Sequence, residues 1–330
     1  MPEEWMPPGL TLPPRDLTSS RMSGPTAEPT KQGSSASISL RRLQALGDSI
    51  CVRDARGRSR SPALLPRGRP GGDGHLEIRG SFAILQRFSV SPQEGRTFVE
   101  ASRDANPIHT EDSVISGAMS AARVLLLPEI LIPGLAVKTV RIKFRAFARY
   151  DRPSVNRYLF RPGSDGSFQV DLVLLQQGAV VADGSLTACV AEGSCPAIPH
   201  TIPRIATNQG QVIRDFFRSL RVDPDLSLEA IGLGYPRAFL AALPSGEMVR
   251  RGGSGGLLNV LDLEFPDVEI PAFTDEPPPS VEVESTRPKS AFRKVLARVG
   301  NGIVTYCQGY ATVLASMLRS SAHEAAPTGA

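Results

Sequence analysis

The sequence has few aromatic residues and no long hydrophobic run. Aromatics make up 6% of the 330 residues, and Trp5 is the single tryptophan. No window approaches the roughly 18 apolar residues that a transmembrane helix requires, so we expect no membrane span. The N-terminus, MPEEWMPPGLTLPPRD, is acidic and rich in proline. It lacks the apolar core of a secretory signal, so we expect no such signal either.

Cysteine is also scarce, and its spacing excludes the usual metal and disulfide frameworks. No CxxC pair occurs, and no histidine lies at zinc-finger spacing from any cysteine. We therefore expect no metal site and no disulfide scaffold, and this usage fits a cytoplasmic protein best. The cysteines are Cys51, Cys189, Cys195 and Cys307.

The formal net charge of +4 belongs to one end of the chain. Residues 1–75 contain eleven Lys or Arg and seven Asp or Glu, which accounts for the whole excess. Residues 76–330 contain 26 of each sign. The arginines near residue 56 are not interleaved with aromatic side chains. The sequence therefore predicts no specific nucleic-acid partner.

The composition also changes along the chain. Residues 1–75 contain ten Pro, nine Gly and ten Ser. Because such a segment can bury little apolar surface, we predict a disordered tail over residues 1–78. We predict disorder for residues 319–330 as well.

The first folded segment begins with a predicted strand, Phe82–Phe88. Ser91 is placed to cap a helix, with proline at its first position and Glu94 at its third. This helix should end before Pro107. Ser116 should cap a second helix over residues 117–127, which we expect Pro128 to end. The second helix is apolar on nearly all sides, so it should be buried.

Several strands should follow these helices. The sequence Gln177-Gly178 between the last two is typical of a tight hairpin turn. A buried helix followed by antiparallel strands is an α+β pattern. The predicted strands cover residues 136–148, 156–160, 167–176 and 179–191.

A weak internal repeat extends the same pattern to the C-terminal half. A shift of 117 positions aligns Asn106-Pro107 with Asp223-Pro224, and Gly117 with Gly234. Near the end, the segment after Asp183 resembles the segment after Gln308 at a larger shift. We interpret this as a duplicated fold. The predicted domains are residues 79–192 and 205–318, joined by a linker at 193–204.

One stretch of the first unit contains residues suited to acid–base chemistry. Asp104 and His109 lie five positions apart, across a turn that Asn106-Pro107 should hold. Such a turn can bring a carboxylate and an imidazole to one space, as proton transfer near neutral pH requires. Taken alone, the pair could instead be purely structural, with His109 capping the loop and Asp104 bonding local amides, as is more common for such pairs. His109 is the one histidine inside a predicted folded unit.

This stretch resembles the signature of the MaoC-like, or (R)-specific enoyl-CoA hydratase, family. That signature contains Asp-x-Asn-Pro-apolar-His, and here Asp104, Asn106, Pro107 and His109 match it. In the family the loop precedes a small-residue turn that opens a central helix, and here Gly117-Ala118-Met119 opens one. The resemblance implies a hot-dog fold, in which an antiparallel sheet wraps around that helix. With the internal repeat, it implies a tandem hot-dog.

The resemblance also implies an activity, the reversible syn hydration of 2-enoyl thioesters carried on coenzyme A or acyl carrier protein. Asp104 and His109 would activate one water, and the backbone N–H of Gly117 would hold the thioester carbonyl. Asn106 and Met119 would contact the substrate. The reaction requires no cofactor. The expected assembly is a hot-dog pair within the chain, with a homodimer as a further possibility.

The sequence departs from the family pattern at several positions. Arg103 replaces the usual glycine, and the segment between His109 and Gly117 is about nine residues shorter. The central helix has leucines near positions 125 and 126, where some members carry a polar residue. In the second copy, Arg221 and Leu226 occupy the positions of Asp104 and His109, so we expect that copy to be inactive.

Two other functions remain open from the sequence. A hot-dog thioesterase would use a carboxylate to activate water at the carbonyl carbon. A degenerate hot-dog pair would instead bind acyl groups or support assembly without catalysis. Convergence of Asp104 and His109 would favour the hydratase, whereas an ion pair between Arg103 and Asp104 would favour the binding module.

Overall fold

An antiparallel sheet of eleven strands organises the part of the chain that the computed structural model describes. Its strand order is β11-β12-β13-β10-β6-β9-β8-β7-β5-β2-β3. The described residues all belong to the unit Ser34–Ala330. They are 35–46, 49–54, 57–60, 74–104, 106–109, 113–163, 166–190, 208–250, 257–268, 270, 272–273, 278–285 and 292–314.

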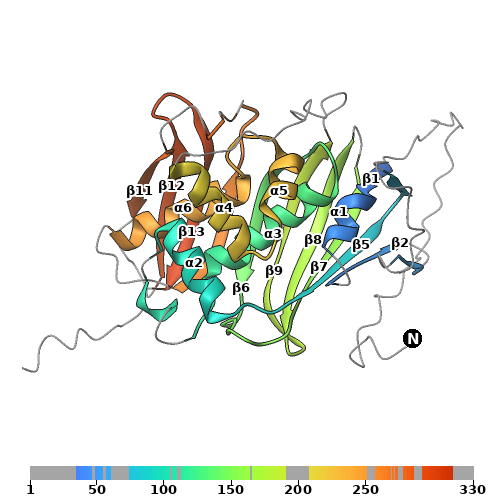
Figure 1. Ribbon diagram of the computed structural model, residues 1–330. Coiled ribbons are helices and arrows are strands. Elements are labelled where there is room, and N and C mark those ends of the chain that lie inside the picture. Colours follow the sequence, from blue (N-terminus) through green and yellow to red (C-terminus); the bar gives the residue numbers. More distant parts are fainter. Residues whose placement is uncertain are drawn as a thin grey trace, which may run out of the picture. The chain divides into compact units, whose positions relative to one another are not determined.

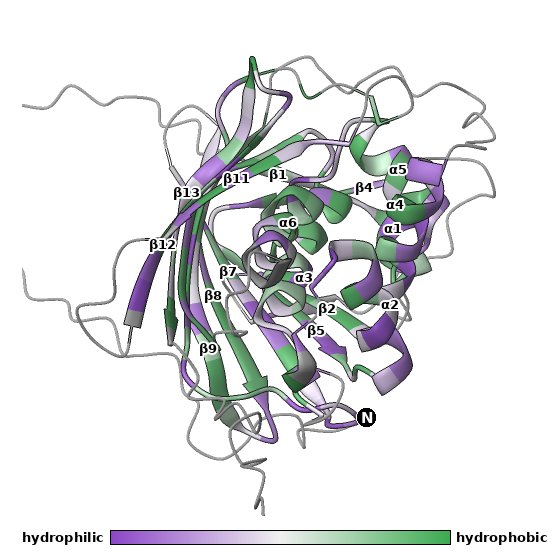
Figure 2. Ribbon diagram, turned by 90° about the vertical axis from the view of Figure 1, so that its left-hand side faces the viewer, coloured by the Kyte–Doolittle hydropathy of each residue, from purple (hydrophilic) through white to green (hydrophobic). Residues whose placement is uncertain are grey.

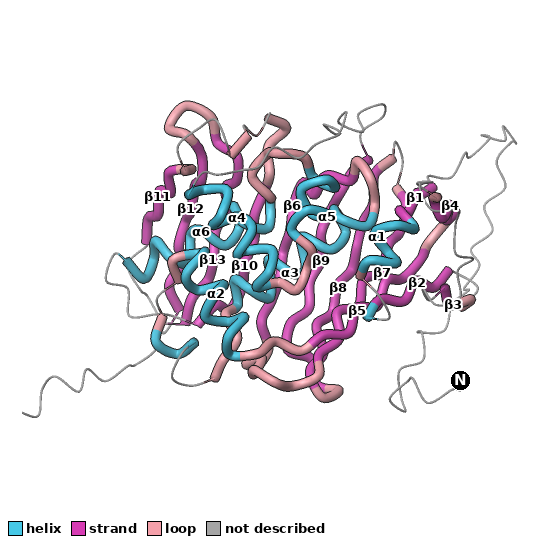
Figure 3. Tube along the Cα trace, in the orientation of Figure 1, coloured by secondary structure: helices cyan, strands magenta, loops and turns pink. Residues whose placement is uncertain are grey.

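The strands of this sheet come from both halves of the sequence, as Figures 1 and 3 show. Strands β6 and β10 pair directly, with Val140 opposite Leu263, so the two halves share one continuous sheet. The strands are β2 Ile50–Asp54, β3 Ser59–Arg60, β5 Phe82–Phe88, β6 Leu135–Phe144, β7 Ser154–Pro162, β8 Ser167–Gln176, β9 Ala179–Val190, β10 Leu257–Glu264, β11 Ser280–Ser285, β12 Phe292–Gly300 and β13 Thr305–Leu314.

The helices lie together on one face of the sheet. Figure 2 shows the sheet curving around α3 and α6, with α2, α4 and α5 on the side away from the strands. No helix among the described residues is long and apolar enough to span a membrane. The helices are α1 Leu40–Ala45, α2 Pro92–Ser102, α3 Gly117–Leu131, α4 Asn208–Ser219, α5 Pro224–Ile231 and α6 Arg237–Arg250, with a 3₁₀ turn at Pro107–His109.

Two helices and one hairpin turn of the first half begin where local sequence signals predict them. Ser91 and Glu94 form a complete capping box at the start of α2, and Ser116 caps α3. Gln177 and Gly178 both have positive φ, at 52° and 83°. This is the conformation of the tight turn that matches the twist of a hairpin. The predicted α+β class is confirmed.

The prediction that Pro128 ends the central helix is wrong. α3 continues to Leu131, and the N–H of Ile132 still bonds the carbonyl of Pro128. Proline removes only one donor near the helix end, and complete burial of Ile130 and Leu131 favours the last turn. In the second half Pro244 likewise lies inside α6.

The prediction of a disordered tail over residues 1–78 is wrong for several segments of it. Strands β1 (Ser35–Ser39) and β4 (His75–Arg79) form a small sheet, and β2 extends the large sheet by pairing with β5. The apolar side chains of Ile38, Leu43 and Val52 are fully buried. These apolar segments are short, so the average composition of residues 1–78 does not reveal them. Residues 1–34 and 61–73, like the predicted linker and residues 319–330, lie outside the described residues.

The order of elements in the first half recurs in the second. α2, the 3₁₀ turn, α3 and β6–β9 are followed by α4, α5, α6 and β10–β13. Gly184 and Gly309 mark equivalent positions, because a Cβ on either would meet a backbone carbonyl of the neighbouring strand, at Arg141 or Asp262, within 2.1 Å. The aligned glycines support the predicted duplication.

A buried ion pair joins the two central helices. Arg237 at the start of α6 donates to Glu129 of α3 at 3.1 Å, and the backbone N–H of Val137 donates to the same carboxylate oxygen. The Glu129 side chain is 3% exposed and that of Arg237 is 22% exposed. Burial raises the pKa of Glu129, although Arg237 and the Val137 N–H act in the opposite direction.

Candidate functional site

The end of α2 directs the chain into the loop that contains the predicted acid–base residues. Arg103 ends the helix in the left-handed conformation, with φ 58°. This reverses the backbone, and the N–H of Asp104 bonds the carbonyl of Val99 at 3.0 Å. The side chain of Asp104 therefore turns inward, and the residue is 3% exposed.

A second turn places His109 beside Asp104. The carbonyl of Asn106 accepts the His109 N–H at 3.1 Å, and the Asn106 side chain accepts the Ile108 N–H at 3.3 Å. His109 is 7% exposed. Its Nε2 lies 3.5 Å from Oδ2 of Asp104. The two groups predicted from the sequence thus meet in one buried place.

The surroundings of the pair define its hydrogen-bonding state. His109 Nδ1 lies 3.0 Å from the carbonyl oxygen of Val114. A carbonyl can only accept, so in the neutral ring Nδ1 carries the proton and Nε2 is an acceptor. Asp104 Oδ2 accepts the hydroxyl proton of Ser116 at 2.9 Å. Nε2 and Oδ2 are therefore two acceptors that a single donor molecule can bridge.

Ser116 connects the carboxylate to the start of the central helix. Its Oγ accepts the N–H of Ala118 at 3.2 Å while it donates to Asp104. Sequence reasoning identified Ser116 only as a helix cap. The same hydroxyl fixes the position of Asp104 relative to the first turn of α3.

Tyr150 is a residue of this site that the sequence analysis missed. Its hydroxyl donates to the carbonyl of His109 at 3.1 Å. Burial, together with the charge of Asp104, raises the Tyr150 pKa to about 12, so the phenol keeps its proton at neutral pH. Gly95 of α2 leaves room for the ring, because a Cβ there would lie 2.2 Å from the Tyr150 oxygen. A glycine inside a predicted helix was the sequence feature that could have indicated this close contact.

The second half of the chain packs against both sides of the site. A Cβ on Gly246 of α6 would lie 2.4 Å from the carbonyl oxygen of Ser102, so α6 touches the end of α2. A Cβ on Gly117 would lie 3.1 Å from the side chain of Leu258 in β10. The first turn of α3 is therefore covered by a strand of the second half.

The remaining predicted residues occupy distinct positions. Asn106 is buried and builds the turn described above, and Met119 is fully buried in the first helical turn of α3. Substrate contacts of both stay predictions. Arg103 is exposed, and no ion pair joins it to Asp104 in the described part of the chain.

The equivalent region of the second half has a different arrangement. Arg221 pairs with Glu94, the residue that completes the capping box of α2. Leu226 is buried within α5. The two positions that hold the acid–base pair in the first half therefore have other roles in the second half. One of them supports the N-terminus of α2.

Similarity to known proteins is found at the level of the fold. No protein-family model and no curated protein sequence matches the chain. A solved MaoC-like dehydratase aligns with a TM-score of 0.50 and 9% identity, covering 71% of this chain and 96% of that one. This similarity confirms the expected hot-dog fold.

Two further solved structures align with lower scores. The peroxisomal multifunctional enzyme type 2 of Drosophila melanogaster has a TM-score of 0.48 and 11% identity, over 70% of this chain and 48% of that one. A protein of Novosphingobium aromaticivorans, provisionally named a thioesterase, has a TM-score of 0.43 and 14% identity, over 72% and 96%.

Proposed function

We propose that this protein is a lyase that adds water reversibly to 2-enoyl thioesters, giving 3-hydroxyacyl thioesters. One observation carries the proposal. His109 Nε2 and Asp104 Oδ2 are two buried acceptors 3.5 Å apart. One water can donate a hydrogen bond to each of them, which leaves its oxygen lone pairs free to attack a substrate carbon. A pair of this kind provides general acid–base catalysis close to neutral pH.

The reaction follows from this arrangement. The water oxygen bonds to C3 of the enoyl group while its proton passes to the Asp104–His109 pair. The electron pair of the C2–C3 double bond moves toward the thioester carbonyl, and an enolate forms. A proton from the same pair then bonds to C2 on the same face, which accounts for syn addition. Dehydration is the same sequence in reverse.

The enolate oxygen requires a hydrogen-bond donor. In our proposal the N–H of Gly117 supplies it, because N–H groups in the first turn of a helix have no intrahelical partner and face positive potential. The Ser116 hydroxyl accepts the N–H of Ala118 and donates to Asp104, and Gly117 lies between Ser116 and Ala118 at the start of α3. Donors held in place at a developing charge are among the largest contributions to catalysis.

The proposal includes the remaining expectations. The acyl group would be carried on coenzyme A or acyl carrier protein, no cofactor would be needed, and the protein would act in the cytoplasm. The domains would be residues 79–192 and 205–318, with the second serving as the inactive partner in an intrachain pair. Further association into a homodimer is compatible with this arrangement.

Hydration of crotonyl-CoA by the full chain tests the function. The account predicts loss of the enoyl absorbance with formation of 3-hydroxybutyryl-CoA. Free thiol measured in the same reaction separates the alternatives, because a thioesterase releases coenzyme A and a hydratase does not. Absence of hydration with short, long and carrier-linked enoyl thioesters would contradict the proposal and favour a non-catalytic acyl-binding protein.

Ser116 should act as a positioning residue for Asp104. Ser116→Ala removes the cap of α3 and is expected to lower the free energy of unfolding by about 1 kcal/mol. It should also reduce kcat more than KM, because Asp104 loses the hydroxyl that orients it. Ser116→Thr retains a hydroxyl and should recover most of both. Urea unfolding and crotonyl-CoA kinetics measure the two effects, and an unchanged kcat in Ser116→Ala would reject the positioning role.

A further inference from the structure

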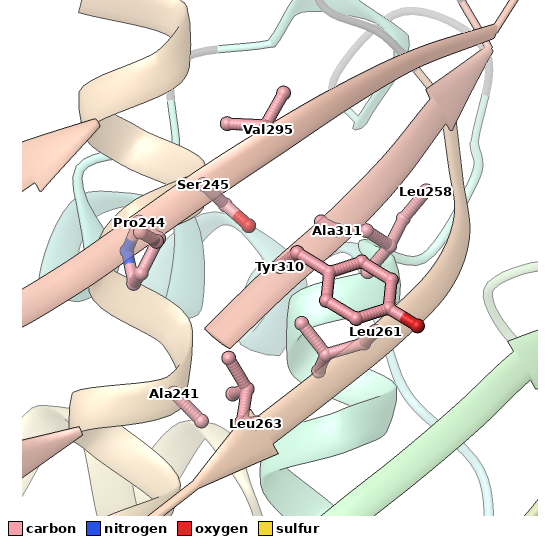
Figure 4. Close-up of a pocket in the computed structure, with 10 residues that line it drawn as sticks. Ala241, Pro244, Ser245, Leu258, Leu261, Leu263, Val295, Tyr310 and Ala311 are labelled. Atoms are coloured by element: carbon pink, nitrogen blue, oxygen red, sulfur yellow. The ribbon is translucent and has the colours of Figure 1, made fainter. Parts of the chain in front are cut away.

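Two kinds of contact surround the candidate site. Apolar side chains of the second half cover the first turn of α3, where Leu258 of β10 lies against Gly117. Figure 4 shows Leu258 among the mainly apolar residues between α6 and the sheet. A polar contact to His109 comes instead from Tyr150, in the connection between β6 and β7. This connection, residues 145–153, is therefore a part of the first half that can orient His109.

The connection forms a short antiparallel pair with the residues just before α3. Two backbone hydrogen bonds, at 2.8 and 3.2 Å, join the segment 113–115 to the segment 148–150. They flank Val114 and Arg149, which lie directly opposite each other. In an antiparallel pair, two residues in this position do not bond each other, and their own N–H and C=O groups point outward. Val114 and Arg149 therefore present backbone groups to neighbours on opposite sides.

The neighbours on the two sides are His109 and Gln176. The Val114 carbonyl lies 3.0 Å from Nδ1 of His109. On the other side, the side chain of Gln176 at the end of β8 bonds both backbone groups of Arg149. Its Oε1 accepts the Arg149 N–H at 2.9 Å, and its Nε2 donates to the Arg149 carbonyl at 3.0 Å. A primary amide has the same donor and acceptor as a peptide group, so Gln176 bonds Arg149 as a neighbouring strand would.

The amide of Gln176 is itself held in one orientation. Gln176 is 7% exposed, and its Nε2 also donates to Oγ of Ser154 at 3.0 Å. Ser154 lies opposite Gln176 in the β7–β8 pair and is 3% exposed. Reversal of the amide would bring its NH₂ group against the N–H of Arg149, where two donors would meet. Gln176 is therefore a buried and fixed support for the connection.

The connection also holds the backbone of His109. Tyr150 directly follows Arg149, and its hydroxyl donates to the His109 carbonyl at 3.1 Å. The position of Arg149 therefore affects both the ring of His109, through Val114, and its main chain, through Tyr150.

We infer that Gln176 is a positioning residue for His109. By holding Arg149, it keeps the Val114 carbonyl against Nδ1 of the histidine ring. The ring proton then stays on Nδ1, and Nε2 remains an acceptor. In the other neutral tautomer Nε2 carries the proton and cannot take one from water. The inference rests on the proposed function for the role of this water, and Gln176 itself does not touch the reacting atoms.

Gln176→Met tests the inference, because methionine is of similar size and lacks the amide. The variant should lose at least about 10-fold in kcat with little change in KM, as expected when a catalytic group is displaced by a fraction of an ångström or more. Nitrogen NMR of histidine-labelled protein at about pH 8.5, above the ordinary histidine pKa, reads the tautomer directly. The parent should show the His109 proton on Nδ1, and the variant a mixture of both tautomers. The spectrum of His109→Gln identifies the signal among the four histidines.

Gln86→Met is the matched control. Gln86 of β5 is also 7% exposed, and its Oε1 accepts a hydrogen bond from Asn156 of β7 at 3.4 Å. Its loss should lower stability but leave the His109 tautomer and kcat as in the parent. If Gln176→Met does not fold, Gln176→Asn keeps an amide that is too short to reach both backbone groups of Arg149. It should change the tautomer and kcat in the same direction.

Two results would overturn the inference. One is a folded Gln176 variant with the His109 tautomer and kcat of the parent. The other is an equal change in Gln86→Met, which would show that a general loss of stability is the cause.

The NMR measurement also separates this inference from the proposed function. A parent protein that hydrates crotonyl-CoA, with an unchanged tautomer in Gln176→Met, keeps its function and loses the positioning role of Gln176. A parent that hydrates no enoyl thioester, but whose His109 tautomer changes in Gln176→Met, loses the function. The support of His109 by Gln176 would then stand.

Discussion

Asp104→Asn is expected to lower kcat/KM for crotonyl-CoA by at least about 1000-fold, within the range that general acid–base groups contribute. Asparagine preserves the size of the side chain and can still accept the hydroxyl of Ser116. It cannot take a proton from water, so the attacking oxygen remains a weak nucleophile. Initial rates of enoyl absorbance loss measure the effect, and circular dichroism checks that the variant is folded.

Asp171→Asn is the control for this substitution. Asp171 forms an ion pair with Arg161, and its side chain is 41% exposed. Loss of such a surface pair changes stability by at most about 1 kcal/mol, and it should not affect hydration. An Asp104→Asn protein with more than a tenth of the parent rate would show that Asp104 does not act on the water.

Arg237→Met is expected to lower the free energy of unfolding at neutral pH by about 3 kcal/mol or more, because removal of one partner leaves a buried charge uncompensated. The Glu129 carboxylate would keep only the N–H of Val137 as a donor among its present contacts. The side chain of Arg237 also packs at the start of α6, next to α3. Urea unfolding measures the change.

The loss in Arg237→Met should depend on pH. Burial raises the pKa of Glu129 in the folded protein, and removal of the cation raises it further. The folded state then holds a proton at pH values where the unfolded chain has released it. The variant is therefore most stable below the unfolded pKa of about 4.3, and it loses stability as pH rises through the folded pKa.

Unfolding at about pH 5 and about pH 8 should show the larger deficit at the higher value. Arg298→Met is the matched control, because Arg298 forms an exposed pair with Glu282 at 3.7 Å. Its effect should stay below about 1 kcal/mol at both pH values. A deficit of that size in Arg237→Met would mean that the pair between α3 and α6 contributes little to the fold.

Much of the first half could be predicted because its signals are local. The capping box at Ser91, the cap at Ser116 and the turn at Gln177-Gly178 each depend on residues within a few positions of one another. The Asp104–His109 pair is also local, because one turn brings it together. The candidate site could therefore be predicted from residues that are close in the sequence, without knowledge of the long-range packing.

Features that depend on distant contacts could not be read from the sequence. Strand β2 lies in a segment rich in Pro and Gly. Its partner β5 is distant in the sequence, and composition does not reveal which strand it pairs with. Tyr150 reaches His109 from 41 positions away. The central helix was expected to be apolar, yet it buries Glu129 and Arg123, and the Arg123 guanidinium lies 4.4 Å from the ring centre of Phe88.

A double-mutant cycle on crotonyl-CoA hydration tests the central claim most directly. The claim is that Asp104 and His109 act together on one water. Asp104→Asn, His109→Gln and the combined variant are compared by kcat/KM. Residues that act as one unit are strongly non-additive, so the combined variant should be about as slow as the slower single variant. Rate losses that multiply in the combined variant would show that the two residues act independently, and would contradict the account.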